Sequence, residues 1–142
     1  MKNYVNEMKV SLPSHSSNEG LCRSIAASFV AQFNPTIEEL SDVKCAVSEA
    51  VTNAIVHGYR YAPGEIILRF RADADRCIYL EIKDRGCGID DVKTAMQPLY
   101  TTDTTGERSG MGFAVMQTFT DRVTVRSKPG RGTTVAMRKQ LS

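Results

Sequence analysis

The sequence predicts an α+β fold: a two-layer α/β sandwich in which helices cover one face of a mixed, mainly antiparallel sheet. Two helical patterns come first, with apolar residues every four positions from Leu21 to Phe33 and at i, i+3, i+4 and i+7 spacing from Val43 to Ile55. Strands follow, because apolar and polar residues alternate over residues 66–71 and 78–83. Each strand has one apolar face, so the sheet needs cover on one side only.

The first two elements are an edge strand and a helix. Apolar residues alternate over residues 8–12 and meet Pro13, which lacks the N–H that a central strand needs. The polar residues 14–18 offer N-caps for the helix. We expect it to end near Asn34–Pro35, because a residue before proline disfavours helical geometry.

A capping box marks the start of the second helix, since Thr36 is followed three residues later by Glu39. We expect this helix to stop at Gly58. Glu49 and Asn53 are four residues apart, so their side chains stack on one helical face beside the apolar stripe. Such a pair is more often a solvated flank than a site, and only the later motifs reverse that interpretation.

The second half of the chain predicts a hairpin, a long loop, a helix and a final pair of strands. A polar loop at residues 73–76 joins the first two strands, and residues 96–109 have little periodicity. A loop of that length in a small domain is either disordered or functional. A helical pattern resumes from Gly110 to Phe119, and strands at 123–125 and 133–137 close the chain.

Length and charge limit the class of protein. A chain of 142 residues is typical of one domain, which we expect over residues 1–142. The formal net charge of +2 does not favour direct binding to nucleic acid or to an anionic membrane. No apolar run approaches a membrane span and the start of the chain predicts no signal peptide, so we expect a cytoplasmic protein.

The cysteines predict free thiols rather than a zinc site. No two of the four form a Cys-x-x-Cys pair, and neither histidine lies near a cysteine in the sequence. Buried or half-buried thiols in a reducing compartment are the interpretation for Cys22, Cys45, Cys77 and Cys87.

A carboxylate is predicted to point inward at the end of the second strand of the hairpin. Asp84 follows Ile82 in the apolar phase, and in the last strand Thr133 shares the inward phase. A buried carboxylate needs a donor, which an amine or amide of a ligand could supply. A strand-end cap is the commoner role for such a residue. Gly86 and Gly88 follow in an Asp-x-Gly-x-Gly pattern, and they would let the backbone pass close to a flat group.

A glycine-rich turn opens the late helix. Residues 106–113 read Gly-Glu-Arg-Ser-Gly-Met-Gly-Phe, and the free N–H groups of such a first turn favour an anion. Arg108 could clamp a terminal phosphate. The turn lacks the Gly-Lys-Ser/Thr of a Walker A loop, and it follows a loop instead of the strand that a dinucleotide fingerprint requires.

The order of these motifs resembles the GHKL family of ATP-binding domains, named for gyrase, Hsp90, histidine kinases and MutL. The resemblance covers Thr36 to Met137 and implies the Bergerat α/β sandwich. Within the family, residues 49–59, 97–102 and 107–113 are most similar to small serine kinases that act as anti-sigma factors in sporulation. The chain departs from them at Arg85, where the family often has Glu, and at residues 60–64.

The resemblance implies a role for each residue of the site. Asp84 would accept from the adenine amine of ATP or ADP, with Thr133 and the Gly88 backbone completing the base pocket. Asn53 would ligate Mg²⁺, and Glu49 would be the general base on a substrate serine. The implied nucleotide-contacting residues are Asn53, Asp84, Gly86, Gly88, Thr101, Thr102, Arg108, Ser109, Gly110, Met111, Gly112 and Thr133.

The phosphate end of the site would be completed by a lid at about residues 97–109. The turn at residues 109–112 would hold the phosphates. Arg108 would contact the γ-phosphate and would be a catalytic residue beside Glu49.

The resemblance also implies two protein partners. With ATP bound, the protein would sequester a sigma factor; alternatively it would bind an anti-anti-sigma protein and phosphorylate one serine on it. Glu19 and Arg23 lie one turn apart on the first helix, which belongs to the partner surface of this family, although a solvated ion pair explains them equally well. The family implies a homodimer.

Two other functions stay open at this point. One is a nucleotide-dependent anti-sigma binding module that has lost the kinase step, for which Glu49 would be unnecessary. The other is a histidine-kinase-like catalytic domain. The sequence disfavours it, because no phosphoacceptor-histidine helix pair precedes the motifs.

Overall fold

The computed structural model describes residues 3–96 and 112–142. The expected lid at 97–109 lies outside them. So do six of the expected nucleotide-contacting residues: Thr101, Thr102, Arg108, Ser109, Gly110 and Met111. The elements in chain order are β1 (Tyr4–Pro13), α1 (Asn18–Ala31), α2 (Ile37–Asn53), η1 (Ala54–Gly58), β2 (Glu65–Asp73), β3 (Cys77–Asp84), α3 (Val92–Ala95), α4 (Gly112–Phe119), β4 (Arg122–Lys128) and β5 (Gly132–Gln140).

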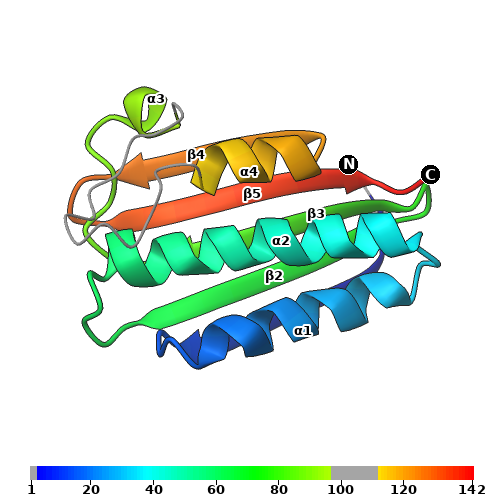
Figure 1. The fold of residues 1–142 in the computed structure, drawn as a ribbon, viewed down its shortest axis with the longest axis horizontal. Coiled ribbons are helices and arrows are strands. Elements are labelled where there is room, and N and C mark those ends of the chain that lie inside the picture. The colour runs from blue at the N-terminus through cyan, green and yellow to red at the C-terminus, as the bar shows by residue number, and fades with distance from the viewer. Residues whose placement is uncertain (1–2, 97–111) are drawn as a thin grey trace.

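The five strands form one sheet in the order β1-β2-β3-β5-β4, and β1 is an edge strand as expected. All four strand pairs are antiparallel, so the sheet expected to be mixed is antiparallel throughout the described residues. The helices α1, α2 and α4 lie side by side on one face of this sheet, with α2 in the middle (Figure 1). The predicted two-layer α+β sandwich is confirmed.

The core lies between α2 and the inner face of the sheet. The predicted stripe on α2 is confirmed, because Val43, Val47 and Val51 are fully buried. They belong to one hydrophobic cluster with inward residues of β2 and β3, such as Phe70 and Leu80. These side chains remove apolar surface from water and fix which face of each strand is turned toward the helices.

The predicted stripe on the first helix is wrong at its N-terminal end. Leu21 is 48% exposed, whereas Cys22 and Ala26 are fully buried. A repeat of four residues drifts around a helix that has 3.6 residues per turn, so Leu21 and Phe33 cannot share one contact line. Cys22 and Ala26, which have small side chains, belong to the buried core cluster instead, and α1 contacts α2.

The second helix was expected to stop at Gly58. The helical segment does extend to that residue, but its last turn has a different helical form. It starts with the predicted capping box, in which the Glu39 N–H donates to Thr36 Oγ1 (3.0 Å) and the Thr36 N–H donates to Glu39 Oε1 (2.9 Å). Its last turn, η1, is π-helical, and the Tyr59 N–H donates to the carbonyl of Ala54 (2.9 Å). Such turns are rare and occur mostly near functional sites.

The remaining elements differ in detail from the sequence predictions. The single-turn helix α3 was not predicted, and the Asp91 side chain caps it by accepting from the Thr94 N–H. The described part of the late helix is α4, which begins at Gly112. Within residues 3–96 and 112–142, no helix has the length and apolar character that crossing a membrane requires.

Candidate functional site

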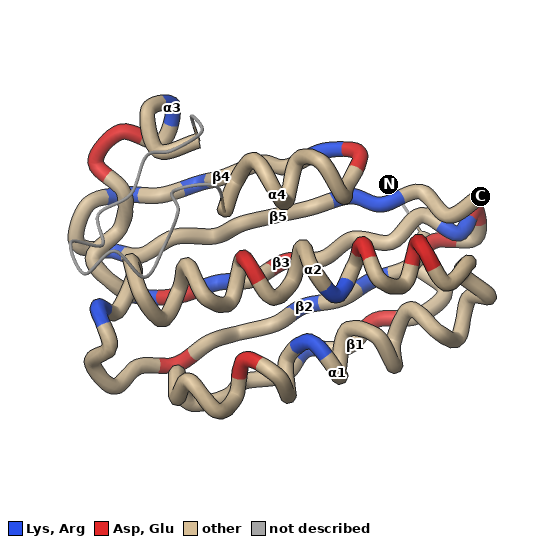
Figure 2. Tube along the Cα trace, in the orientation of Figure 1, with Lys and Arg blue, Asp and Glu red and all other residues tan. Residues whose placement is uncertain are grey.

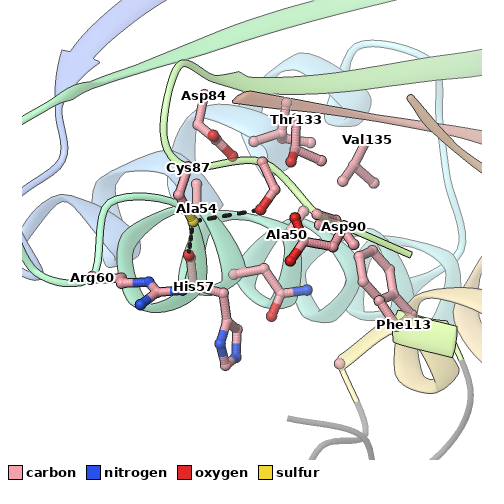
Figure 3. A pocket seen from close by; sticks show the side chains of 17 residues that line it. Ala50, Ala54, His57, Arg60, Asp84, Cys87, Asp90, Phe113, Thr133 and Val135 are labelled. Carbon is pink, nitrogen blue, oxygen red and sulfur yellow. Dashed lines mark hydrogen bonds between the residues drawn. The ribbon is translucent and has the colours of Figure 1, made fainter. Parts of the chain in front are cut away.

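A pocket opens where η1, the loop after β3, the start of α4 and the inner face of β5 meet (Figure 3). Its apolar wall comes from α2, η1 and the sheet: Ala50, Ala54, Ile82 and Val135. Its polar residues include Asn53, Asp84 and Thr133, which the family resemblance had implied to share one site. An apolar pocket with a few converging polar groups is the usual form of a small-molecule site.

Asp84 is buried at the end of β3, as its phase predicted, and it is 6% exposed. Its Oδ1 accepts a hydrogen bond from the Gly86 N–H at 2.9 Å. Burial raises the pKa of the Asp84 carboxyl above its ordinary value, and backbone N–H groups of Gly86 and Thr133 oppose that rise. A carboxylate in this state gains from any further donor, so an amine entering the pocket would be stabilised there.

The glycines after Asp84 are required by the protein itself. A Cβ on Gly86 would lie 2.1 Å from the Gly58 carbonyl oxygen, and one on Gly88 would lie 2.1 Å from that of Lys128. These glycines were expected to let the backbone pass close to a flat group of a ligand. In the structure, they let it pass close to neighbouring backbone. Gly88 also lines the pocket, whereas Gly86 stands behind it and holds the Asp84 carboxylate.

Thr133 faces inward on β5, as predicted, and is 8% exposed. It pairs with Asp84 across the β3–β5 ladder, so the two side chains reach the same end of the pocket. Its Oγ1 lies 2.8 Å from Oγ of Ser127 on β4. Ser127 was missed by the sequence analysis, because it lies outside the Asp-x-Gly-x-Gly and glycine-turn motifs.

Glu49 and Asn53 meet the start of α4. A Cβ on Gly112 would lie 3.1 Å from Asn53 Oδ1 and 3.4 Å from Glu49 Oε2. Asn53 and Gly112 line the pocket. The helical pair and the end of the glycine-rich turn, far apart in sequence, are thus brought together as the motif order predicted.

Other pocket residues were not predicted. His57, Arg60, Cys87 and Asp90 line it, as does Phe113. The Cys87 thiol donates to the His57 carbonyl at 3.1 Å (Figure 3). The Cys87 N–H donates to the Gly58 carbonyl at 2.8 Å. Only the position of Cys87 inside the Asp-x-Gly-x-Gly pattern was a sequence signal for this contact.

The two predicted partner residues lie elsewhere. Glu19 and Arg23 form an ion pair of 3.7 Å on α1, and Glu19 also accepts a hydrogen bond from the Ser48 hydroxyl on α2. Neither residue lines the pocket. Figure 2 shows acidic and basic positions along α1, in the helical layer.

The described residues contain no group of three or more His, Cys, Asp and Glu side chains that could hold a metal ion. Mg²⁺ usually takes most of its ligands from water and from substrate phosphates, and few from the protein. The single carboxamide oxygen of Asn53 fits this mode of binding.

Comparison with known proteins agrees with the fold. A family model described as a histidine kinase-like ATPase domain matches residues 12–139. The RsbU and RsbW domains of Rv1364c from Mycobacterium tuberculosis superpose with a TM-score of 0.70 and 18% identity over 96% of this chain and 33% of that one. A histidine kinase domain from Erythrobacter litoralis EL346 gives a TM-score of 0.57 and 20% identity over 87% of this chain and 61% of that one. The family match, which covers most of the chain, therefore defines a histidine kinase-like ATPase domain.

The sequence relatives narrow this class. The anti-sigma F factor of Caldanaerobacter subterraneus subsp. tengcongensis is 51% identical over 97% of this chain and 96% of its own length. The anti-sigma F factor of Thermoanaerobacter sp. (strain X514) is 49% identical over the same shares, and that of Bacillus velezensis is 47% identical over 96% and 94%. The chain belongs to the family of anti-sigma F factors.

Proposed function

We propose that this protein is an ATP-dependent anti-sigma factor that sequesters a sporulation sigma factor of the F type and phosphorylates a serine of its anti-anti-sigma antagonist. The names of relatives that are 49% and 51% identical support the sigma factor as a partner. The ATPase family match supports a nucleotide in the pocket. The kinase step, Mg²⁺, the antagonist and a homodimer are part of the proposal.

The observation that carries the catalytic part is the meeting of Glu49 and Asn53 with Gly112. One turn of α2 thereby brings a carboxylate and a carboxamide to Gly112, the described residue of the turn that would hold the phosphates. Asp84 lies further along the same pocket, next to Gly58. A ligand with a base at Asp84 and phosphates at Asn53 would span the pocket.

Each residue then has a chemical task. Asp84 accepts from the amine of the base, and Asn53 would hold Mg²⁺, which neutralises phosphate charge when bound. Arg108 and the turn at residues 109–112 would hold the terminal phosphates. Glu49 takes the proton of the substrate serine hydroxyl as its oxygen attacks, a contribution of roughly 10²–10⁴-fold to the rate.

A phosphotransfer assay with labelled ATP, Mg²⁺ and a candidate anti-anti-sigma protein tests the proposal. Glu49→Ala should retain nucleotide binding and lose phosphotransfer by roughly 10²–10⁴-fold. Glu38→Ala, which changes an exposed carboxylate at the start of the same helix, is the matched control. Normal phosphotransfer by Glu49→Ala would reject the general base.

The same assay with the wild-type protein distinguishes the proposed kinase from the second candidate, a binding module without a kinase step. The binding module predicts ATP-dependent binding of the sigma factor and no transfer to the antagonist. Light scattering with and without nucleotide tests the homodimer, for which twice the mass of 15.7 kDa is expected.

A further inference from the structure

A cluster of hydroxyl groups lies behind the wall of the pocket, where β4 and β5 meet the loop after β3. Ser127 Oγ accepts from the Ile89 N–H at 2.8 Å and donates to the Gly132 carbonyl at 2.9 Å. It also lies 2.8 Å from Thr133 Oγ1, its neighbour across the β4–β5 ladder. Ser127 does not line the pocket, but Thr133 does.

The donors and acceptors of this cluster assign the direction of each hydrogen bond. A serine hydroxyl has one proton and two lone pairs. The Gly132 carbonyl can only accept, so the Ser127 proton is used there, and the Ile89 N–H occupies one Ser127 lone pair. The contact between Ser127 Oγ and Thr133 Oγ1 also needs a proton, and the Ser127 proton is already used. The proton must therefore come from Thr133, which makes Thr133 the donor and Ser127 the acceptor.

We infer that Ser127 is a positioning residue that sets the polarity of Thr133 and thereby selects a 6-amino purine over a 6-oxo purine. With its single proton held by Ser127, Thr133 Oγ1 can offer only lone pairs to the pocket. Asp84, at the same end of the pocket, is also an acceptor. An exocyclic amine has two N–H groups for these oxygens, whereas an exocyclic carbonyl places its lone pairs against theirs.

This inference rests on the proposed nucleotide site and adds a residue to it. Asp84 alone would favour an amine, but a hydroxyl beside it that was free to rotate could donate to a carbonyl. Such a hydroxyl would weaken the discrimination. Ser127 removes that freedom without touching the ligand. Thr133 is 8% exposed, so a wrongly paired ligand group would find little water there to replace the lost hydrogen bond.

The test compares dissociation constants of ADP and inosine diphosphate by calorimetry with the full chain. Ser127→Ala should reduce the preference for ADP by roughly threefold to tenfold, the value of one hydrogen bond. Ser127→Thr keeps the hydroxyl and should retain the preference. Thr133→Val should reduce it as Ser127→Ala does, and adding Ser127→Ala to Thr133→Val should change it no further.

Three outcomes overturn the inference. One is an unchanged ADP preference in Ser127→Ala, and another is an equal loss for both nucleotides, which would indicate a structural role only. The third is additivity of the Ser127→Ala and Thr133→Val effects. Thr124→Ala, an exposed hydroxyl on the same strand, is the control for β4. A wild-type protein that binds neither nucleotide would refute the proposed function itself, together with this inference. If Ser127→Ala does not fold, a preference for ADP that is unchanged in Thr133→Val decides against it.

Discussion

Replacing Asp84 by asparagine should weaken nucleotide binding without weakening the fold. Asparagine has the same shape, and its carbonyl oxygen can still accept from the Gly86 N–H. Its NH₂ group then presents donors where the pocket had a carboxylate, opposite the amine of the base. A hydrogen bond to a charged group contributes about 1.5–3 kcal/mol, so ADP should bind roughly 10- to 150-fold more weakly.

Most substitutions that remove a buried contact destabilise the fold, but Asp84→Asn is not expected to do so at neutral pH. Burial raises the pKa of Asp84, so the folded state binds its proton more readily than the unfolded state does. The contribution of Asp84 to stability is therefore favourable at acidic pH and is lost as the pH rises through the folded pKa. At neutral pH, Asp84→Asn should be at least as stable as the wild type.

Calorimetry with ADP and urea unfolding test these two statements together. Unfolding is measured at neutral pH and at roughly pH 4, near the ordinary pKa of an aspartate. The difference in stability between the variant and the wild type should shrink at the lower pH. Glu81→Gln, on the opposite face of β3, is the control. Undiminished ADP affinity of Asp84→Asn, or a large loss of its stability at neutral pH, would refute the reasoning.

Three further substitutions test the supports of the site. Gly86→Ala would bring a Cβ to 2.1 Å from the Gly58 carbonyl oxygen, and urea unfolding should show a destabilisation of about 1–3 kcal/mol. Gly130→Ala is the comparison: its Cβ would meet no atom within 4 Å, but the φ of +76° should cost about 1–2 kcal/mol at most. Thr36→Ala removes the capping box and should cost about 1 kcal/mol in the same measurement, and a shift within error would mean that the cap contributes nothing. Arg108→Ala should weaken phosphotransfer and alter partner binding; a change in stability alone would contradict the phosphate role.

Strand phase is the reason that much of the site could be predicted. Asp84 and Thr133 each continue an alternation of buried residues, so the sequence determines which face of the sheet they reach. Their pairing across β3 and β5 needed the topology as well, because residues 49 positions apart become neighbours only when β5 lies beside β3. Helical spacing likewise placed Glu49 and Asn53 together, but their meeting with Gly112 depends on how α4 packs against α2.

The parts that could not be predicted depend on contacts that leave no periodic signal. Ser127 follows no motif, and its importance appears only from its hydrogen-bond partners in two other segments. The repeat that suggested Leu21 as a core residue passed over Cys22 and Ala26, whose smaller side chains are the fully buried ones. The π-helical turn at 54–58 has no composition that distinguishes it from an ordinary helix end.

The hydrogen bond between Glu19 and Ser48 connects the predicted partner residues on α1 with α2. Ser48 precedes Glu49 on α2, so one helical turn is bonded to the predicted partner surface and also meets the start of α4. If ATP and ADP differ by some factor in how strongly they favour a protein bound at Glu19, that protein must discriminate between ATP and ADP by the same factor. A bound sigma factor would then act as an effector of the pocket. Its release would change the affinity for nucleotide by the same factor by which nucleotide exchange changes the affinity for the sigma factor.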